Sequence, residues 1–294
     1  MTIAAIINPI SGAGADRNAA ARRSETLQTA LDRRGQRATI SFTARAGHAR
    51  ELAADAIAAG ADLLIVWGGD GTVNEAGGAL LGTRTALGLV PAGSGNGLAA
   101  ALGTPRDPHA AIALALDGSP RAIDAGVIAG RPFFNIAGVG VDARIARRFN
   151  ERGQGSRGAW PYVAISLAEG CRYCSEEYEV ELDGDATRLR ALLIAFANGR
   201  EYGIGARLSA AARLDDGLLD AVVVEDRSIV GRFWAARHLA SGTPGRARRV
   251  TARQVRQAVI RGRGPIEYHA DGETGVAERE LSVGIRPGAL WVKR

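Results

Sequence analysis

The first third of the chain repeats one pattern: a short apolar segment, a turn-rich loop and a helix-like stretch. Apolar segments at 3–7, 38–42, 63–67 and 86–90 alternate with expected helices at 17–34, at 49–59, from after the loop 68–71 to about Leu81, and after the loop 91–96, and one more helix is expected at 110–116. Continuous apolar strands that alternate with helices are typical of a parallel sheet covered on both faces. The pattern therefore predicts an α/β domain with a parallel sheet.

The pattern changes after the Pro-rich segment 105–108. Strands are expected at 123–128, 133–139, 178–182, 189–197, 218–224 and 255–260, with one helical stretch near 161–169. A chain of 294 residues also exceeds what one core usually organises. We expect an α/β domain over 1–122, completed by about 284–294, and a mainly β domain over 123–283. The active site is expected in the cleft between them.

The composition bears on where the protein is located and on which partners and metals it could bind. No apolar run approaches the ~20 residues of a membrane span, and no secretory leader is visible, so a cytoplasmic protein is expected. The net charge is +6, but Lys293 is the only lysine, so the basic residues reflect an arginine-rich composition as much as an acidic partner. Cys171 and Cys174 form a lone CxxC without further metal ligands at suitable spacing, and we interpret them as reduced thiols.

Three glycine-rich loops follow the first, third and fourth apolar segments: NPISGAG at 8–14, GGDG at 68–71 and PAGSGN at 91–96. In an open parallel sheet, ligands bind beyond the carboxyl ends of the strands. Glycine lets backbone N–H groups approach phosphate oxygens, and the following helix N-termini add positive charge. Neither a GxxxxGK[ST] loop nor a GxGxxG first turn is present, so the loops predict a phosphate site of another kind.

Asp70 stands between glycines in the second of these loops. A carboxylate beside phosphates is repulsive unless it binds Mg²⁺ or takes a proton from a substrate hydroxyl. An Asp before Gly is also an ordinary turn residue. The phosphate-loop context favours the functional interpretation.

The run GGDGTVNE at 68–75 resembles the GGDGT-x-x-E signature of the diacylglycerol kinase catalytic domain superfamily, which includes bacterial lipid kinases, sphingosine kinases and ceramide kinases. NPISG at 8–12 and PAGSGN at 91–96 match the first and third phosphate loops of that family. NIAGVGVDA at 135–143, DDGLLD at 215–220 and DGE at 271–273 follow in the family's order. The resemblance covers nearly the whole chain.

This resemblance implies an ATP-dependent lipid kinase with Asp70 and Glu273 as catalytic carboxylates, and it leaves open which of them takes the proton. It implies that Asp142 contacts the lipid substrate. It implies a Mg²⁺ site made by the backbone oxygens of Arg213 and Leu218 with the Asp216 side chain, near Asp124. The implied ATP contacts are Asn8, Pro9, Ser11, Gly12, Thr43, Gly68, Gly69, Gly71, Thr72, Asn74, Glu75, Gly93, Ser94 and Asn96.

The acceptor lipid stays open because Gly97 stands where bacterial diacylglycerol kinases usually carry Asp, which is closer to the pattern of sphingosine kinases. NAD kinase, which shares the GGDGT loop, is one alternative, but its NxGxxGFL motif is missing. A non-catalytic nucleotide-binding regulator is another; it would be expected to lose a carboxylate, whereas Asp70, Glu75 and Glu273 are all present.

The expected partner is a lipid substrate presented by a membrane surface, with no nucleic acid, and a homodimer is left open. Residues 229–239 place Phe233 and Trp234 among arginines, and Arg246, Arg248 and Arg249 follow. An aromatic patch with a basic rim suits docking on anionic lipid. An amphipathic helix packed on the β domain accounts for the same residues, and both interpretations stay open.

Overall fold

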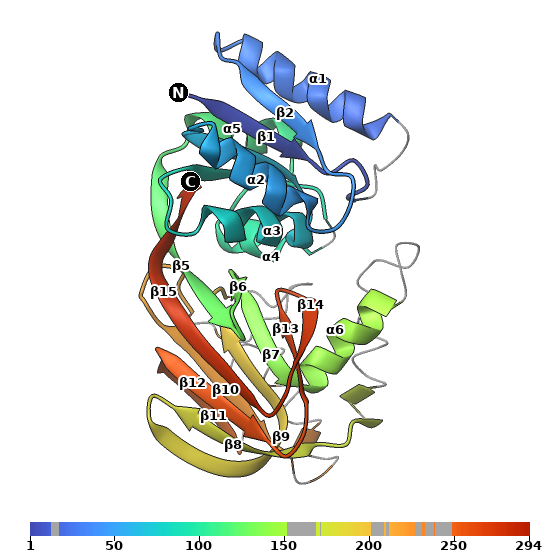
Figure 1. Ribbon diagram of the computed structural model, residues 1–294, viewed down its shortest axis with the longest axis vertical. Helices are drawn as coiled ribbons and strands as arrows, with labels where there is room; N and C mark the ends of the chain where they lie inside the picture. Colours follow the sequence, from blue (N-terminus) through green and yellow to red (C-terminus); the bar gives the residue numbers. More distant parts are fainter. Residues whose placement is uncertain are drawn as a thin grey trace. The chain divides into compact units, whose positions relative to one another are not determined.

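The computed structural model describes residues 1–12, 18–93, 95–151, 169–170, 172–200, 209, 212–226, 228, 231–232, 238 and 249–294. The chain forms two compact units (Figure 1). The first contains residues 1–123 and 288–294, and the second contains residues 124–287. Ser94 of the third loop, residues 161–168 of the helix expected near 161–169, and Phe233, Trp234, Arg246 and Arg248 of the expected lipid-docking region lie outside the described residues.

The first unit is built on a parallel sheet in the order β2-β1-β3-β4. Its strands are β1 (Ile3–Ile7), β2 (Ala38–Phe42), β3 (Leu63–Gly68) and β4 (Ala86–Pro91). The four strands predicted from the apolar segments are confirmed. Near the C-terminus, Val292 pairs in parallel with Leu87 of β4, so the last residues of the chain add to this sheet.

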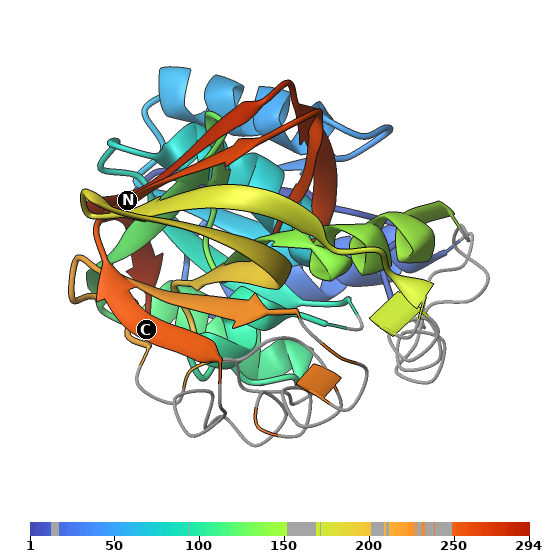
Figure 2. The same cartoon turned by 90° about the horizontal axis from the view of Figure 1, so that it is seen from below.

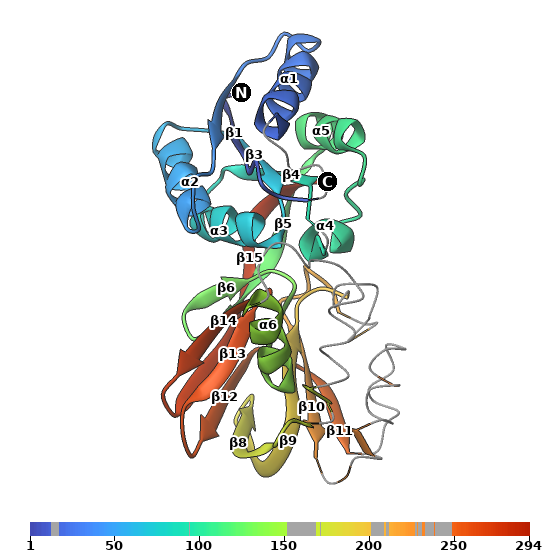
Figure 3. The same ribbon diagram turned by 90° about the vertical axis from the view of Figure 1, so that its right-hand side faces the viewer.

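Helices cover both faces of the parallel sheet. They are α1 (Ala19–Asp32), α2 (His48–Ala58), α3 (Asp70–Leu80), the short α4 (Gly97–Ala101) and α5 (Pro108–Asp117). Figure 3 shows α1 and α5 on one side of the strands and α2 and α3 on the other. Leu27 and Leu31 of α1 pack with Ile112 and Leu116 of α5 against the apolar face of β1, β3 and β4.

The second unit is mainly β structure, as the sequence predicts, and its strands pair antiparallel. The strands of its main path run in the order β14-β13-β7-β9-β8-β12-β15, and β10 and β11 extend it beside β9. They are β7 (Ile136–Gly140), β8 (Glu176–Leu182), β9 (Asp185–Ala197), β10 (Leu219–Glu225), β11 (Val250–Val255), β12 (Gln257–Gly262), β13 (Ile266–Ala270), β14 (Glu273–Ala277) and β15 (Glu280–Lys293). β5 (Pro120–Ile128) pairs with β6 (Arg131–Phe133) and with β15.

Two predicted strands of the second unit are wrong, and one helix was missed. The expected strand 133–139 is interrupted, because the N–H groups of residues 134–136 donate to the carboxylate of Asp271. The expected strand 255–260 is two strands that break at Arg256, whose N–H donates to Asp183. Helix α6 (Val141–Glu151) was not predicted; it starts directly at the end of β7 and lies along the strands of this unit (Figure 2).

No helix in the described part of the chain is both long enough and apolar enough to cross a bilayer.

Candidate active site

The three glycine-rich loops of the first unit lie at one edge of the parallel sheet. Ile7, Trp67 and Val90 stand side by side at the ends of β1, β3 and β4, because Ile7 pairs with Trp67 and Trp67 pairs with Val90. Each loop therefore starts from the same level of the sheet. This is the carboxyl edge at which open α/β sheets bind ligands.

The loops pack backbone against backbone, and glycine is what permits this. A Cβ on Gly12 would lie 1.9 Å from the carbonyl oxygen of Ala92, and one on Gly93 would lie 2.8 Å from the Cα of Gly69. Gly12 also has a left-handed φ of 79°. A side chain at these positions would push the loops apart, so glycine is required here for loop contact as well as for access to phosphate.

The Asp70 carboxylate joins the second loop to the third. Its Oδ2 accepts the N–H of Asn96 at 2.8 Å, and its Oδ1 accepts the N–H of Gly97 at 2.7 Å. Asn96 has a left-handed φ of 54°, and its amide side chain closes the third loop through the N–H and carbonyl of Gly93. Asp70 thus begins α3 and also holds the start of α4.

The first loop is held by a residue that was not predicted, Arg23 of α1. Its guanidinium donates to the carbonyl of Asn8, to Ser11 Oγ at 3.1 Å and to the Ser11 carbonyl at 2.6 Å, and it lies 5.8 Å from the centre of the Trp67 ring. Burial lowers the pKa of Arg23, with a smaller contribution from the neighbouring Arg22 charge. One arginine inside an arginine-rich helix carries no sequence signal of such a role.

Asn8 and Glu75 connect the loops to their surroundings. Asn8 Nδ2 donates to Thr72 Oγ1 at 2.8 Å, which links the first and second loops. Glu75 accepts the N–H of Gly47 at 2.7 Å and that of Ala49 at 3.1 Å, at the N-terminus of α2. Both Glu75 oxygens are therefore used on backbone amides, although the sequence predicts an ATP contact at this residue.

This loop cluster suits the binding of a phosphate group. Helix α3 has Gly69 as its N-cap and so has no capping side chain at its first turn, which leaves a helix N-terminus of the kind that binds anions. Of the remaining predicted contacts, Pro9 lies in the first loop, and Gly71 and Asn74 lie in α3. Thr43 follows β2, and its N–H donates to the carbonyl of Ile7 at the end of β1.

The predicted Mg²⁺ ligands of the second unit also gather. Asp124 is 3% exposed, and its Oδ2 accepts the N–H of Gly217 at 2.7 Å. Asp216 Oδ1 accepts the N–H of Leu218 at 3.1 Å. The oxygens of these carboxylates and of the backbone at Arg213 and Leu218 are the donors that Mg²⁺ prefers. No cluster of three or more His, Cys, Asp and Glu side chains occurs among the described residues, so a cation here would also need carbonyl and water oxygens.

Glu273 stands exposed at the start of β14, after the two-residue turn Asp271–Gly272 of the β13–β14 hairpin. The carboxylate of Asp271 accepts the N–H groups of residues 134–136 at 2.7–3.0 Å. Asp142, the predicted substrate residue, is 3% exposed and hydrogen-bonded to His269, a residue that the sequence did not single out. The DGE motif and the following strand are therefore fixed on β7 and α6.

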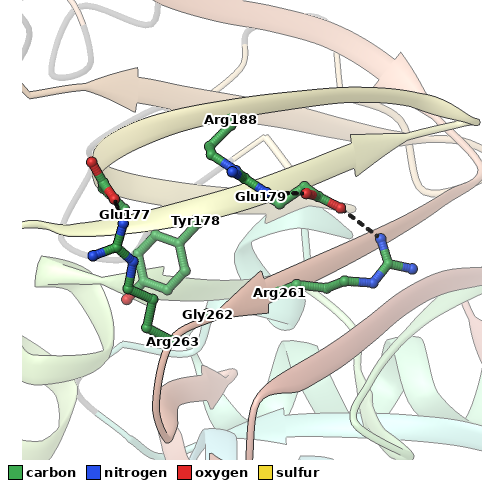
Figure 4. A pocket seen from close by; sticks show the side chains of 7 residues that line it. All are labelled: Glu177, Tyr178, Glu179, Arg188, Arg261, Gly262 and Arg263. Carbon is green, nitrogen blue, oxygen red and sulfur yellow. Dashed lines mark hydrogen bonds and ion pairs between the residues drawn. The ribbon is translucent and has the colours of Figure 1, made fainter.

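One hollow of the second unit, of about 210 Å³, lies over β8, β9 and β12 (Figure 4). Arg188 and Arg261 both pair with Glu179, at 3.0 and 3.4 Å, and Arg263 pairs with Glu177 at 2.5 Å. These cross-strand pairs compensate the charges that line the hollow. It is a solvated sheet surface and no candidate active site.

A second hollow of about 300 Å³ lies beside α6 and β13 and is lined in part by Arg144, Tyr173, Tyr178 and Glu267. Burial raises the pKa of both tyrosines, so their hydroxyls stay protonated at neutral pH. This hollow holds neutral hydroxyls and charged groups of both signs, and the free thiol of Cys174 also lines it.

Comparison with known proteins places this arrangement in a family. The model of the diacylglycerol kinase catalytic domain matches residues 2–128, and that of the YegS C-terminal NAD kinase beta sandwich-like domain matches residues 135–294. The chain is 32% identical over 269 residues to a protein named "Probable lipid kinase YegS-like" of Pseudomonas aeruginosa strain UCBPP-PA14, which covers 88% of this chain and 85% of that relative.

A diacylglycerol kinase of Mycobacterium tuberculosis strain CDC 1551 is 34% identical over 233 residues, 77% of this chain and 74% of its own. The crystal structure of a diacylglycerol kinase from Bacillus anthracis strain Sterne has the same fold, with a TM-score of 0.73 at 20% identity over 99% of this chain and 96% of that one. Both parts of the chain match one group of enzymes, and the protein belongs to the diacylglycerol kinase family of lipid kinases, with a YegS-type C-terminal domain.

Proposed function

We propose that the protein transfers the γ-phosphoryl group of ATP to the hydroxyl of a lipid, either a diacylglycerol or a sphingoid or ceramide-like lipid. The observation that carries this proposal is the contact of three glycine-rich loops with Asp70 between them, on the carboxyl edge of a parallel sheet. Residues 1–122 with the C-terminal strand serve as the nucleotide-binding domain, and residues 123–283 serve as the lipid-binding domain.

In the reaction, the lipid hydroxyl oxygen bonds to the γ-phosphorus, the bond from that phosphorus to the β,γ-bridging oxygen breaks, and ADP leaves. We assign the hydroxyl proton to the carboxylate of Glu273, which is exposed and free to meet a substrate. Asp70 is less suited to this task because both of its oxygens accept backbone N–H groups. Its negative charge is suited to a cation that accompanies the phosphates, and Mg²⁺ would supply charge neutralisation there.

The acceptor class is tested by transfer of radiolabelled phosphate from ATP in mixed micelles that contain diacylglycerol, monoacylglycerol, sphingosine, ceramide or a total lipid extract. We expect a labelled product with at least one of these lipids and none with NAD. Labelled NADP would favour the NAD kinase alternative. Saturable ATP binding without transfer to any acceptor would favour a nucleotide-binding regulator and contradict the proposal.

A further inference from the structure

The pair of Asp142 and His269 is buried in the second unit and has no part in the reaction as described so far. His269 Nε2 lies 2.6 Å from Asp142 Oδ2, and the two side chains are 4% and 3% exposed. Asp142 stands in the first turn of α6, where the helix dipole favours a carboxylate. Side chains this buried act through another residue, not by touching a lipid.

The second ring nitrogen of His269 connects the pair to the hairpin turn. His269 Nδ1 lies 3.3 Å from the backbone N of Gly272, whose N–H points to it as a donor. An Nδ1 that accepts a hydrogen bond carries no proton, so the ring proton is on Nε2 and is donated to Asp142. This tautomer follows from the hydrogen-bond partners.

The turn that carries Glu273 is held on several sides. Asp271 and Gly272 have φ values of 48° and 89°, as in a two-residue hairpin turn. The Asp271 carboxylate holds the turn to residues 134–136, and Asn150 Nδ2 of α6 donates to the Gly272 carbonyl at 2.9 Å. Glu273 is the next residue, so the position of its backbone is set by Gly272.

The neighbouring strand β7 leaves room for the pair. Gly138 of β7 pairs with His269 of β13. A Cβ on Gly138 would lie 2.3 Å from Asp142 Oδ2 and 3.0 Å from His269 Nε2. Glycine at this position therefore keeps the space in which the two side chains meet.

We propose that Asp142 and His269 are a buried positioning pair for Glu273: Asp142 orients the imidazole, and the imidazole holds the N–H of Gly272 and with it the turn that presents the carboxylate. The proposal rests on the proposed function in that Glu273 is taken as the base. It replaces a direct substrate contact at Asp142 with an indirect role.

Protonation of His269 would turn Nδ1 into a donor and break the contact with Gly272. Burial alone lowers the pKa of His269, but the charge of Asp142, its hydrogen bond and the charge of Asp271 outweigh burial and raise that pKa. The charges that act on the ring are those of Asp142 of α6 and Asp271 of the turn, and β7 carries no charged residue. Turnover is therefore expected to fall as pH falls through this raised pKa.

The contribution of His269 to stability has the opposite sign. A raised pKa in the folded state gives stability that is present below the unfolded pKa and is lost as pH rises through the folded pKa. Activity and stability should thus change in opposite directions over the same pH window, which a purely structural histidine would not produce.

Two variants of His269 separate its two hydrogen bonds. His269→Gln places a donor towards Asp142 but no acceptor beside Gly272, whereas His269→Asn keeps an acceptor at the δ position. We expect His269→Gln to lower kcat by about 10- to 100-fold, as a displaced catalytic group does, with KM for ATP unchanged. His269→Asn should recover part of this loss. Ile266→Val, a buried change in the same strand, controls for destabilisation and should keep wild-type kcat.

The double variant His269→Gln/Glu273→Gln should be no slower than Glu273→Gln alone, because the pair acts through that carboxylate. Additive losses would overturn the proposal.

Two nitrogen-15 NMR measurements do not depend on the lipid. The His269 ring should carry its proton on Nε2 at about pH 8, and the Gly272 N–H should exchange faster in His269→Gln than in the wild-type protein. A proton on Nδ1, or an unchanged exchange rate of the Gly272 N–H, would contradict the proposed positioning role even if phosphoryl transfer is observed. If both NMR results are as expected but no transfer occurs, only the proposed function is contradicted.

Discussion

At the residue scale, the two predicted catalytic carboxylates have different surroundings. Asp70 uses both oxygens on backbone N–H groups at 2.7 and 2.8 Å, whereas Glu273 is exposed at the start of β14. A carboxylate that is bonded to two amides contributes to stability, and an exposed one contributes little. The two residues should therefore respond differently to removal of their charge.

We predict that Asp70→Asn destabilises the protein by about 1–3 kcal/mol, since its amide nitrogen would face an N–H donor. Glu273→Gln should stay within about 0.5 kcal/mol of wild type. Each should lower transfer by about 100-fold or more, the range for removal of a catalytic acid–base group, with Asp70→Asn the more severe. Urea unfolding and the transfer assay measure both effects. Transfer by Asp70→Asn at close to the wild-type rate would show that the proposed mechanism is wrong.

At the scale of elements, helix α2 receives its N-terminal cap from another helix. Its N-cap residue is Gly47, which has a left-handed φ of 79° and no side chain to accept the first N–H groups. Glu75 of α3 accepts the N–H groups of Gly47 and Ala49 instead. The last residue of the GGDGT-x-x-E motif thus joins α3 to α2.

Glu75→Gln is expected to cost about 1–2 kcal/mol of unfolding free energy, the usual loss for a helix cap, because one acceptor oxygen becomes a donor. KM for ATP should change little if this cap is the main role of Glu75. Glu51→Gln on the same helix is the control: Glu51 pairs with Arg45 at the surface, and such pairs contribute about 0–1 kcal/mol. An unchanged stability together with a raised KM would instead favour the ATP contact predicted from the sequence.

At the scale of the whole molecule, the Mg²⁺ predicted at Asp216 and Asp124 would join the loop 213–218 of the second unit to strand β5. We predict that Mg²⁺ raises the melting temperature of the wild-type protein, because a ligand that binds only the folded state stabilises it. Asp216→Asn should remove most of this rise. Asp215→Asn, an exposed neighbour paired with Arg213 at 3.2 Å, should keep it. A Mg²⁺-dependent rise of equal size in both variants would count against the site.

Much of the first unit could be predicted from the sequence, because its strands are continuous apolar segments that end in glycine-rich loops. The second unit was harder to predict. The break between β6 and β7 depends on the Asp271 carboxylate, which lies 137 residues away from Phe134 along the chain. Helix α6 combines a buried Asp142 with exposed arginines, and its role as a support for the hairpin turn is not visible in its own residues.

The sequence by itself determined the family, the two kinds of domain and the order of the motifs, since these depend on local apolar pattern and on residue identity. The tertiary structure decided what each motif residue contacts. Asp70 accepts the N–H of Asn96, 26 residues away, and Glu75 accepts that of Gly47, 28 residues away. His269 is hydrogen-bonded to the carboxylate of Asp142, 127 residues away. Such contacts form between segments that are far apart in the chain, so they depend on the tertiary fold that brings those segments together. The residues of one segment alone do not indicate them.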